Sequence, residues 1–444
     1  MPKDDAYLDE VRNVVVSVRG VEPGLVAAVK KLEARLGRPL QGIDLVDVKS
    51  INNPDRIEDK TGTFKEIICN FENKAELQNV LKPYMDTALV ATCRLEDAIK
   101  DFRQVITFLP YISTPSELSL QWCTEKAMMR DRLHAYDLAL VPKYVNLEAY
   151  DSQTLSEAIA GFEFPVIVKP NGLYSSLLVS RCNDRQALEA CLARTFEVIG
   201  DIYAHRDGTG APSVLVEEMI QGDMYSVDAY VDPYGKFYSL PPIQVITAHS
   251  LGLPGFYSYR HIVPTGLNEE QLAGLYDTAR ASMRALNLRS TTAHIELFLS
   301  PSGWKIIELG PRIGGYREDL YREAYGTDHH YNDLLVRLGL EPEIPTQIIK
   351  HAAGVNIYAE EEGIITEISG MDEAQKLPSL VTLGAHHAQV GDMALFADNG
   401  GELIVDAVLS NVDAEQLEAD VARLRELITI KIAAKPELIS GVNQ

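Results

Sequence analysis

The segment AHIELFLSPSGWKIIELGPRIGG, residues 293–315, has the pattern of a β-hairpin that carries two glutamates. Apolar residues flank the turn sequence Pro301-Ser302-Gly303, as in two strands joined by a short loop. Glu296 and Glu308 lie six residues on either side of Ser302. A turn centred on Ser302 therefore places the two glutamates opposite each other on one face of a sheet, with Cβ atoms about 5 Å apart.

Two carboxylates in this arrangement repel each other, and a divalent cation between them removes the repulsion. Mg2+ favours one or two carboxylates together with phosphate oxygens and water. Arg312 and the pair Gly314-Gly315 follow at once, and a guanidinium beside flexible glycines suits a phosphoryl group. We predict a site for Mg2+, or for Mn2+, at Glu296 and Glu308. The alternatives are that one glutamate pairs with a base or that the hairpin register differs.

A second chemical signal precedes the hairpin. Phe164–Lys169 reads as an apolar strand that ends in a lysine, and a loop containing Gly172, Ser175 and Ser176 follows. A lysine in this position can direct its ammonium group at a phosphate, while loop N–H and hydroxyl groups complete the contact. The alternative is a surface lysine at the end of a strand. No GxxxxGK[ST] pattern occurs, which excludes a P-loop.

The order of elements predicts an α/β and α+β protein. Strand patterns alternate with helical patterns over residues 1–115, which favours a parallel sheet, and the GxGxxG fingerprint of dinucleotide-binding domains is missing. Glu117–Tyr136 reads as one long helix. Pro342–Pro345 reads as a linker before a smaller α+β domain.

Composition limits the partners. The chain has 444 residues and a net charge of −23, from 41 basic and 64 acidic residues. Because such a surface repels phosphate backbones, we expect no nucleic-acid partner. Five cysteines without a CxxC pair favour a reduced, cytoplasmic protein, and we see neither a signal peptide nor a membrane span. The sequence leaves the oligomeric state open, a homodimer included.

Taken in order, these segments resemble the ATP-grasp superfamily over about residues 115–345. The segments that carry the resemblance are Lys126-x-x-x-Arg130, the strand ending at Lys169-Pro170, Val216-Glu217-Glu218, Glu296, and Glu308-x-x-x-Arg312. Within the superfamily, residues 294–296 and 302–315 look most like the bacterial L-amino-acid ligases, which make dipeptides and related amides.

The resemblance implies an ATP-grasp fold in four parts. These are an N-terminal parallel α/β domain, a central nucleotide-binding region in two subdomains, and a C-terminal α+β domain. The expected boundaries are 1–115, 116–222 (the lid subdomain with its leading helix), 223–345 (the subdomain with the metal site) and 346–444.

The resemblance also implies residue roles. ATP would be bound by Lys126, Lys169, Ser175, Ser176, Glu217, Glu218, Met219 and Ile220, with adenine held largely by backbone groups of Glu218 and Ile220. Mg2+ would bind Glu296 and Glu308, and Lys169 and Arg312 would be catalytic. The substrate would be contacted by Arg260, His261, His294, Arg312, Gly314 and Gly315, although each histidine could instead be a hydrogen-bonded structural residue.

Four features depart from the family pattern, and one of them is the phosphate loop at residues 173–178, which is poorer in glycine than usual. The family usually has an Asn metal ligand two residues after the second glutamate, where this chain has Gly310. It often has a ribose-binding Glu near position 224, which is Met224 here, so Asp223 or another group would serve. Arg260 stands near a position where the amino-acid ligases tend to carry an acid and a glycine, which suggests a substrate with a second carboxylate.

The expected activity is ATP-dependent joining of an amino-acid-like acid to an amine. A carboxylate does not react with an amine at neutral pH, since oxide would have to leave, and phosphorylation by ATP provides a better leaving group. Two alternatives remain at this point. One is a nucleotide-binding protein without ligase activity, such as a regulatory or assembly subunit. The other is a different ATP-grasp ligase or carboxylase.

Overall fold

The computed structural model describes residues 11–51, 58–173, 177–205, 208–251, 258–359, 361–384, 389–394 and 403–433. The N-terminal part is a four-stranded parallel sheet, as predicted. In spatial order its strands are β3 (Phe64–Cys69), β2 (Gln41–Asp47), β1 (Val14–Val18) and β4 (Ala88–Cys93). The helices around it are α1 (Pro23–Leu36), α2 (Lys74–Leu81) and α3 (Ile99–Val105). Every residue of the VVVSV strand β1 is buried, which is typical of a central parallel strand covered on both faces.

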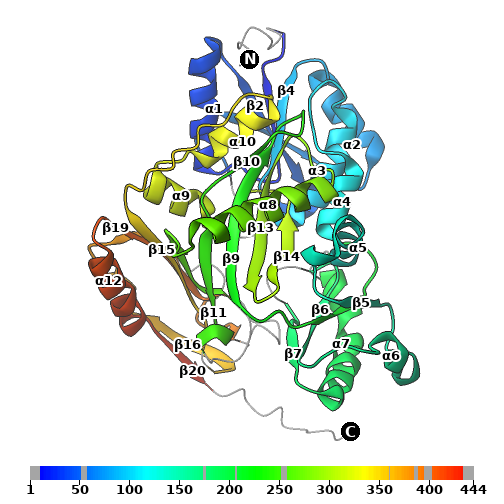
Figure 1. Ribbon diagram of the computed structural model, residues 1–444. Coiled ribbons are helices and arrows are strands. Elements are labelled where there is room, and N and C mark those ends of the chain that lie inside the picture. The colour runs from blue at the N-terminus through cyan, green and yellow to red at the C-terminus, as the bar shows by residue number, and fades with distance from the viewer. Residues whose placement is uncertain are drawn as a thin grey trace, which may run out of the picture.

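A second sheet of four antiparallel strands lies at the lower right of Figure 1. Its strands, in spatial order, are β5 (Tyr144–Leu147), β8 (Val214–Glu218), β6 (Val166–Pro170) and β7 (Ser180–Cys182). The helices α6 (Ser152–Ala158) and α7 (Arg185–His205) complete this unit. Its own core contains Val166, Val168, Val214, Val216 and Leu192, so it packs as a small unit around a separate hydrophobic cluster.

The largest sheet has nine strands and extends from the centre to the left of Figure 1. Its main path is β14 (Gly303–Gly310), β13 (Thr291–Ser300), β9 (Asp223–Val231), β11 (Ile243–Thr247), β12 (Ser258–Val263), β15 (His351–Ile357), β19 (Val405–Asn411) and β17 (Leu380–Gly384), and β10 (Phe237–Ser239) pairs with β9. Helix α8 (Glu269–Ala285) packs on it through Leu275, Ala279 and Met283. The C-terminal strands β15, β17 and β19 thus continue the same sheet as the predicted metal hairpin.

The remaining C-terminal elements form a smaller unit. A three-stranded sheet contains β18 (Met393–Ala394), β16 (Gly363–Ser369) and β20 (Thr429–Ala433), and the nearby helices are α11 (Met371–Ala374) and α12 (Ala414–Leu427). The helices α9 (Arg317–Tyr325) and α10 (His329–Arg337) follow the β13–β14 hairpin. Helix α10 shares a hydrophobic cluster with α1, which joins the N-terminal domain to the central region.

The predicted helix over Glu117–Tyr136 is two helices, α4 (Glu117–Thr124) and α5 (Lys126–Tyr136). Glu125 between them has an extended backbone. The break is stabilised by Asn171, whose backbone carbonyl accepts from the Lys126 amide at 3.2 Å and whose side-chain oxygen accepts from the Ala127 amide at 2.6 Å. An Asn that satisfies free N–H groups in this way starts a new helix at Lys126.

Asp333 of α10 fastens the N-terminal domain to the central sheet. Its carboxylate accepts from Thr92 of β4 at 2.7 Å, from Thr292 of β13 at 2.6 Å, and from Arg337 at 2.8 Å. Both members of the Asp333–Arg337 pair are buried. Although burial by itself raises the pKa of Asp333, Arg337 and the threonine hydroxyls hold that pKa below its usual value.

We expect Asp333→Ala to lower the free energy of unfolding by about 3–5 kcal/mol, because it leaves the Arg337 charge buried without its partner. Urea denaturation followed by circular dichroism measures the effect. Glu341→Ala is the matched control, since Glu341 pairs with Lys236 on the exposed surface, and it should change stability by less than about 1 kcal/mol. Equal unfolding midpoints for the two variants would contradict this account of Asp333.

Candidate active site

A cavity of about 510 Å3 lies between the four-stranded antiparallel sheet and the nine-stranded sheet. Its wall includes residues of β6 and β8 on one side and of β9, β11, β13 and β14 on the other. Eight of the predicted nucleotide and metal residues line it: Lys126, Lys169, Glu217, Glu218, Met219, Ile220, Glu296 and Glu308. Ser175 and Ser176 lie outside the described residues.

Glu296 of β13 and Glu308 of β14 are paired opposite each other, as the hairpin pattern predicts. The register of the hairpin differs from the predicted one, however. Ser300 pairs with Gly303 and Leu297 with Ile306, so the turn is not centred on Ser302, and that register alone would put Ile307 opposite Glu296. A bulge after Ile306 restores the pairing by taking up one extra residue. The Ile307 carbonyl accepts a hydrogen bond from Arg130 Nη2 at 2.7 Å, which holds the bulged strand in place.

Lys126 lies against the second glutamate. As the first residue of α5, it directs Nζ to within 3.0 Å of Glu308 Oε1 and 2.5 Å of the Leu173 carbonyl. Burial alone would raise the pKa of Glu308, but the Lys126 charge holds it below the usual value. Glu308 is therefore ionised, as a metal ligand must be, and Lys126 balances its charge.

Lys169, at the end of β6, forms a buried charge cluster with Glu217 and Arg130. Its Nζ lies 2.5 Å from Glu217 Oε2, and Arg130 Nε contacts the other oxygen of the same carboxylate. Burial tends to raise the pKa of Glu217, yet the two cations hold it below its usual value. Burial lowers the pKa of Lys169 to about 8, with Glu217 opposing and Arg130 adding to the shift.

The Glu217 side chain therefore holds the Lys169 ammonium in place. It does not extend toward the adenine that was predicted to bind at residues 217–220. Arg130 was part of the Lys126-x-x-x-Arg130 motif, but no site role was predicted for it. Its spacing of four residues puts it on the same helix face as Lys126, and that periodicity was the available signal.

The segment after β8, where adenine is predicted to bind, has two backbone amides that are already hydrogen-bonded within the protein. The Glu218 amide donates to the Lys143 carbonyl at 2.9 Å, and the Met219 amide donates to the Pro165 carbonyl at 3.2 Å. The next amide along the cavity wall is that of Ile220. Two apolar side chains of the opposite sheet, Phe298 and Ile307, line the same cavity and give it a flat, apolar part suited to a planar ring.

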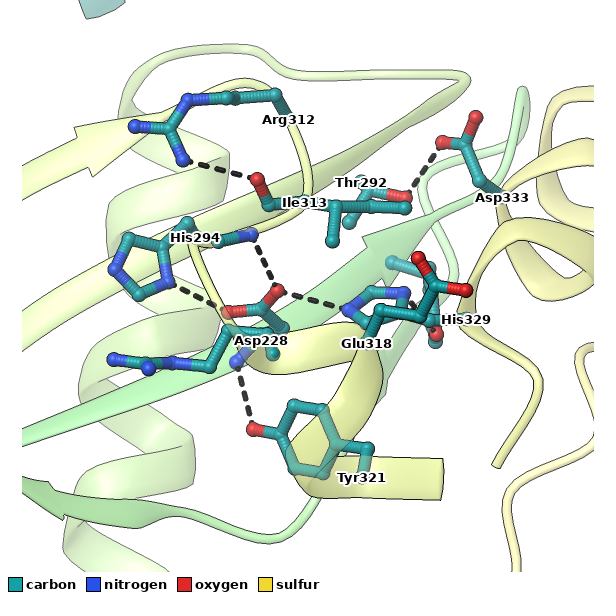
Figure 2. A network of polar contacts seen from close by, with 12 residues as sticks. Asp228, Thr292, His294, Arg312, Ile313, Glu318, Tyr321, His329 and Asp333 are labelled. Atoms are coloured by element: carbon teal, nitrogen blue, oxygen red, sulfur yellow. Dashed lines mark hydrogen bonds and ion pairs between the residues drawn. The ribbon is translucent and has the colours of Figure 1, made fainter. Parts of the chain in front are cut away.

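Asp228 on β9 is the centre of a buried hydrogen-bond network (Figure 2). Its Oδ1 lies 2.6 Å from His294 Nδ1, and its Oδ2 lies 2.8 Å from His329 Nε2 and accepts from the Gly314 amide at 2.9 Å. The other nitrogen of His294 is 3.4 Å from Glu296 Oε1. One carboxylate therefore orients a predicted metal ligand and the glycine loop together.

The charges in this network support one another. Burial alone would raise the pKa of Asp228 and lower that of His294. Their mutual attraction wins, so the pKa of Asp228 lies well below and that of His294 above the usual value. His294 is hydrogen-bonded on both nitrogens. It therefore also fits the alternative that it is a structural residue and does not contact the substrate.

Arg312 is held by the N-terminal domain. Its Nε contacts Glu96 Oε2, and its Nη1 donates to the Ile313 carbonyl at 2.9 Å. The Glu96 charge raises the pKa of Arg312, against the effect of burial. Arg94, two residues before Glu96, donates to the Ile313 carbonyl at 2.9 Å and to the Gly314 carbonyl at 3.3 Å. Both residues follow β4, and sequence reasoning assigned neither to the site.

The residues predicted to contact the substrate lie apart from this cavity. In the described part of the chain, the cavity wall does not include Arg260, His261, His294, Arg312, Gly314 or Gly315. His261 of β12 is buried, its Nδ1 has no hydrogen-bond partner among the described residues, and burial holds its pKa well below the usual value. His261 is therefore neutral, and its ring centroid lies 6.0 Å from that of Tyr316, next to the glycine pair.

Arg260 is engaged elsewhere. Its guanidinium forms an ion pair with Glu418 of α12 through both terminal nitrogens. This contact ties β12 to the C-terminal helix, and the neighbouring Arg425 donates to the Tyr259 carbonyl at 2.9 Å. Arg260 thus joins β12 to α12, and its predicted contact with a substrate stays a prediction.

Two further findings concern the chain as a whole. No described helix combines the length and the apolar character needed to cross a lipid bilayer. All five cysteines are buried and free, and Cys182 and Cys191 pack in the core of the antiparallel unit as small apolar residues.

Comparisons with known proteins concern the fold. Residues 162–318 match the family model of the ATP-grasp domain. The crystal structure of L-amino acid ligase from Bacillus licheniformis superposes with a TM-score of 0.75 at 18% identity, over 96% of this chain and 100% of that one. That likeness covers nearly the whole chain and shows an ATP-grasp fold, with a parallel N-terminal sheet and antiparallel sheets elsewhere.

Curated relatives match over shorter stretches. Carnosine synthase 1 from Gallus gallus is 35% identical over 114 residues, which are 25% of this chain and 12% of that protein. Alanine–anticapsin ligase from Bacillus subtilis is 26% identical over 203 residues, 43% of this chain and 42% of that protein. The chain spans about half or less of the length of the curated relatives it matches.

The lowered pKa of Lys169 predicts a pH dependence for nucleotide binding. The ammonium is charged below its pKa of about 8 and neutral above it. If the charged form binds phosphate, ATP affinity should fall by about tenfold between pH 7 and pH 9. Isothermal titration calorimetry with ATP and Mg2+ at fixed ionic strength measures this. Lys169→Arg keeps its charge over the range and should give a flat profile, and a flat profile for the unmodified protein would rule out this role of Lys169.

Proposed function

Because the chain carries an ATP-grasp domain, we propose that it is an ATP-dependent carboxylate–amine ligase that joins an amino-acid-like acid to an amine. The observation that carries the proposal is the cavity in which Glu296 and Glu308 face each other while Lys126 and Lys169 line the same space. Related proteins named as ligases of amino acids, including alanine–anticapsin ligase, support this direction.

In this proposal ATP lies along the cavity with its base at the hinge. The Glu218 carbonyl and the Ile220 amide are the backbone groups that would recognise adenine, because the amides of Glu218 and Met219 are engaged by the protein. Met219 would contact the ring with its side chain. The phosphates would lie toward Lys126 and Lys169, which are the two lysines on the cavity wall.

The residues present fit a divalent cation. Two opposed carboxylates are partly exposed on the cavity wall, and the Lys126 ammonium beside Glu308 marks a position that favours positive charge. Mg2+, or Mn2+, would be held by Glu296 and Glu308, and when bound it would neutralise charge on the phosphate oxygens. His294 would orient Glu296, since it is itself fixed by Asp228.

The proposed reaction has two steps. A carboxylate oxygen of the acid attacks the γ-phosphorus of ATP, the β–γ bridging bond breaks, and ADP leaves. The amine then attacks the acyl carbon, loses a proton, and expels phosphate. Lys169 and Arg312 would stabilise negative charge on the transferred phosphoryl group, and Lys126 would hold the neighbouring phosphate oxygens.

The substrates would bind beyond the phosphates, near the glycine loop. Arg312, Gly314 and Gly315 lie on one turn that Asp228 and Arg94 hold from two sides. His261 and His294 flank this turn, and both are buried. A small acid with an amino group is the substrate class that relatives such as carnosine synthase and alanine–anticapsin ligase suggest.

The proposal is tested by measuring phosphate release from ATP and Mg2+ with pairs of amino acids, followed by mass spectrometry of the product. We expect release to require both an acid and an amine, and the product mass to equal their sum less one water. Glu308→Gln should lower the rate by at least about 100-fold, because it removes charge where the transition state is stabilised. Glu341→Gln on the surface is the control and should keep the full rate.

Nucleotide binding without release for any pair would instead favour a regulatory or assembly role. Release that depends on bicarbonate in place of an amino acid would favour a carboxylase of the same fold.

Arg260 gives a second test within the same assay. Since its guanidinium is paired with Glu418, we expect Arg260→Ala to leave the KM for the acid within about twofold of the unmodified value, close to RT in free energy. Glu418→Ala, which frees the arginine, should behave likewise. A KM raised by an order of magnitude in Arg260→Ala alone would restore the sequence-based interpretation that Arg260 contacts a second substrate carboxylate.

A further inference from the structure

Arg317, the first residue of α9, is a buried arginine whose charge has no carboxylate partner. It is only 2% exposed. Its guanidinium donates to the Gly315 carbonyl at 3.1 Å and to Ser226 Oγ at 2.8 Å, and both acceptors are uncharged. Within the described part of the chain it forms no ion pair, and its Nε has no hydrogen-bond partner. Arg130 and Arg312, by contrast, each pair with a glutamate. Because burying an unpaired charge is strongly unfavourable, Arg317 marks a place where a ligand supplies the missing anion.

Ser226 places this guanidinium on the face of the large sheet that carries the cavity. Ser226 of β9 pairs directly with Glu296 of β13, and opposed residues share a face with Cβ atoms about 5 Å apart. Glu296 pairs in turn with Glu308, and both line the cavity, as does Met224 two residues before Ser226. Arg317 is not part of the cavity wall. It therefore lies at the edge of the cavity, beside the predicted metal ligands.

His261 is a second buried group on this face with a nitrogen that lacks a partner. It pairs with Val245 of β11, which pairs with Met224 of β9, so the three side chains point to the same face. Its Nδ1 has no hydrogen-bond partner among the described residues. Burial holds the pKa of His261 well below its usual value, and the Arg317 charge adds to that shift, so the imidazole is neutral. A neutral imidazole can donate one N–H to a carboxylate without adding a second charge.

Gly314 allows the arginine to approach this face closely. A Cβ atom at position 314 would lie 2.5 Å from Arg317 Cγ and 2.4 Å from His294 Nδ1, so a larger residue would displace both side chains. The amide of the same glycine donates to Asp228 at 2.9 Å, which fixes the loop. The stem of Arg317 therefore packs against the Asp228 network, and its guanidinium is positioned before any ligand binds.

The chemistry of the proposed reaction indicates which anion this arginine needs. A guanidinium cannot lose its charge in a protein, so its partner has to stay charged through the whole reaction. The carboxylate of the acid substrate does not, because it ends as a neutral amide. An amine substrate that is an amino acid brings a carboxylate of its own, which takes no part in the reaction and leaves with the product. Guanidinium and carboxylate groups match in shape and form parallel hydrogen bonds.

We propose that Arg317 binds the carboxylate of the amine substrate, with His261 beside it, so that the amine substrate is an amino acid. This inference deepens the proposed function and rests on it. It makes Arg317 a residue that determines specificity, although no site role was predicted for it from the sequence. It also implies that the product keeps a free carboxyl group.

The test compares an amino acid with its own amide as the amine, in the phosphate-release assay with ATP, Mg2+ and a saturating acid. The amide can act only as an amine, because its carboxyl group is blocked. We expect the unmodified protein to use the amino acid at least about 30-fold better in kcat/KM, since the amide leaves the buried guanidinium without a counter-charge. In Arg317→Met this preference should fall to within about threefold of unity.

Two further variants and a stability measurement separate ligand binding from a structural role. Arg322→Met is the matched control, since Arg322 lies on the same helix but is exposed and pairs with Asp319, and it should keep the full preference. Arg317→Lys keeps the charge without the planar fork and should retain part of the preference. Because Arg317 has no ionic partner in the protein alone, Arg317→Met should unfold at the same urea concentration as the unmodified protein or a higher one.

The outcomes distinguish this inference from the proposed function. No phosphate release by the unmodified protein with any pair would refute the proposed function itself. Release with equal use of amino acid and amide by the unmodified protein would overturn the role of Arg317 alone. A preference that persists in Arg317→Met, with both kcat/KM values and the urea midpoint lowered, would leave Arg317 a purely structural role. A raised KM for the acid in Arg317→Met, measured with the amide as the amine, would overturn the assignment by placing Arg317 at the acid substrate.

Discussion

Glu296 and Glu308 face each other across paired strands, and the rest of the site is arranged around the repulsion between these carboxylates. Two like charges in direct opposition destabilise a sheet unless a cation lies nearby. The protein brings Lys126 to Glu308 at the start of α5 and joins His294 to Glu296. Two local irregularities produce this arrangement: a bulge in β14 sets Glu308 opposite Glu296, and a helix break at Glu125 places Lys126 at the start of α5. The site residues Glu308 and Lys126 are therefore positioned by irregular points of the backbone.

The N-terminal domain belongs to this arrangement and is not merely an appendage. Thr92, Arg94 and Glu96 all follow or end β4, and each binds a different part of the central region. Thr92 reaches Asp333 of α10, Arg94 holds the glycine loop, and Glu96 contacts Arg312. Residues at the carboxyl ends of parallel strands are the usual contributors to a site in α/β folds. The position of the parallel sheet therefore fixes the loop between β14 and α9.

Much of the site could be predicted from local sequence because its parts repeat with the period of a strand or helix. The opposition of Glu296 and Glu308 followed from counting along a hairpin, although the predicted centre of the turn was wrong and a bulge compensated for it. The parallel sheet followed from alternation of strand and helix patterns. Contacts between distant segments could not be predicted in this way. Arg130 and Glu217 are 87 positions apart, and Glu96 and Arg312 are 216 apart, with no periodicity to link them. The helix break at Glu125 depends on Asn171, a distant residue that helix propensity does not take into account.

Three cations of the site already have a carboxylate partner: Lys126 has Glu308, Lys169 has Glu217, and Arg312 has Glu96. An isolated buried charge costs several kcal/mol, so these pairs keep the site stable before any ligand arrives. A polyphosphate with its divalent cation carries both signs of charge, and it can exchange partners with every pair at once. Phosphate without the cation would take the lysines and leave Glu296 and Glu308 repelling each other. The cation without phosphate would take the carboxylates and leave the lysines unpaired. The charge arrangement therefore favours joint binding of nucleotide and metal over binding of either alone.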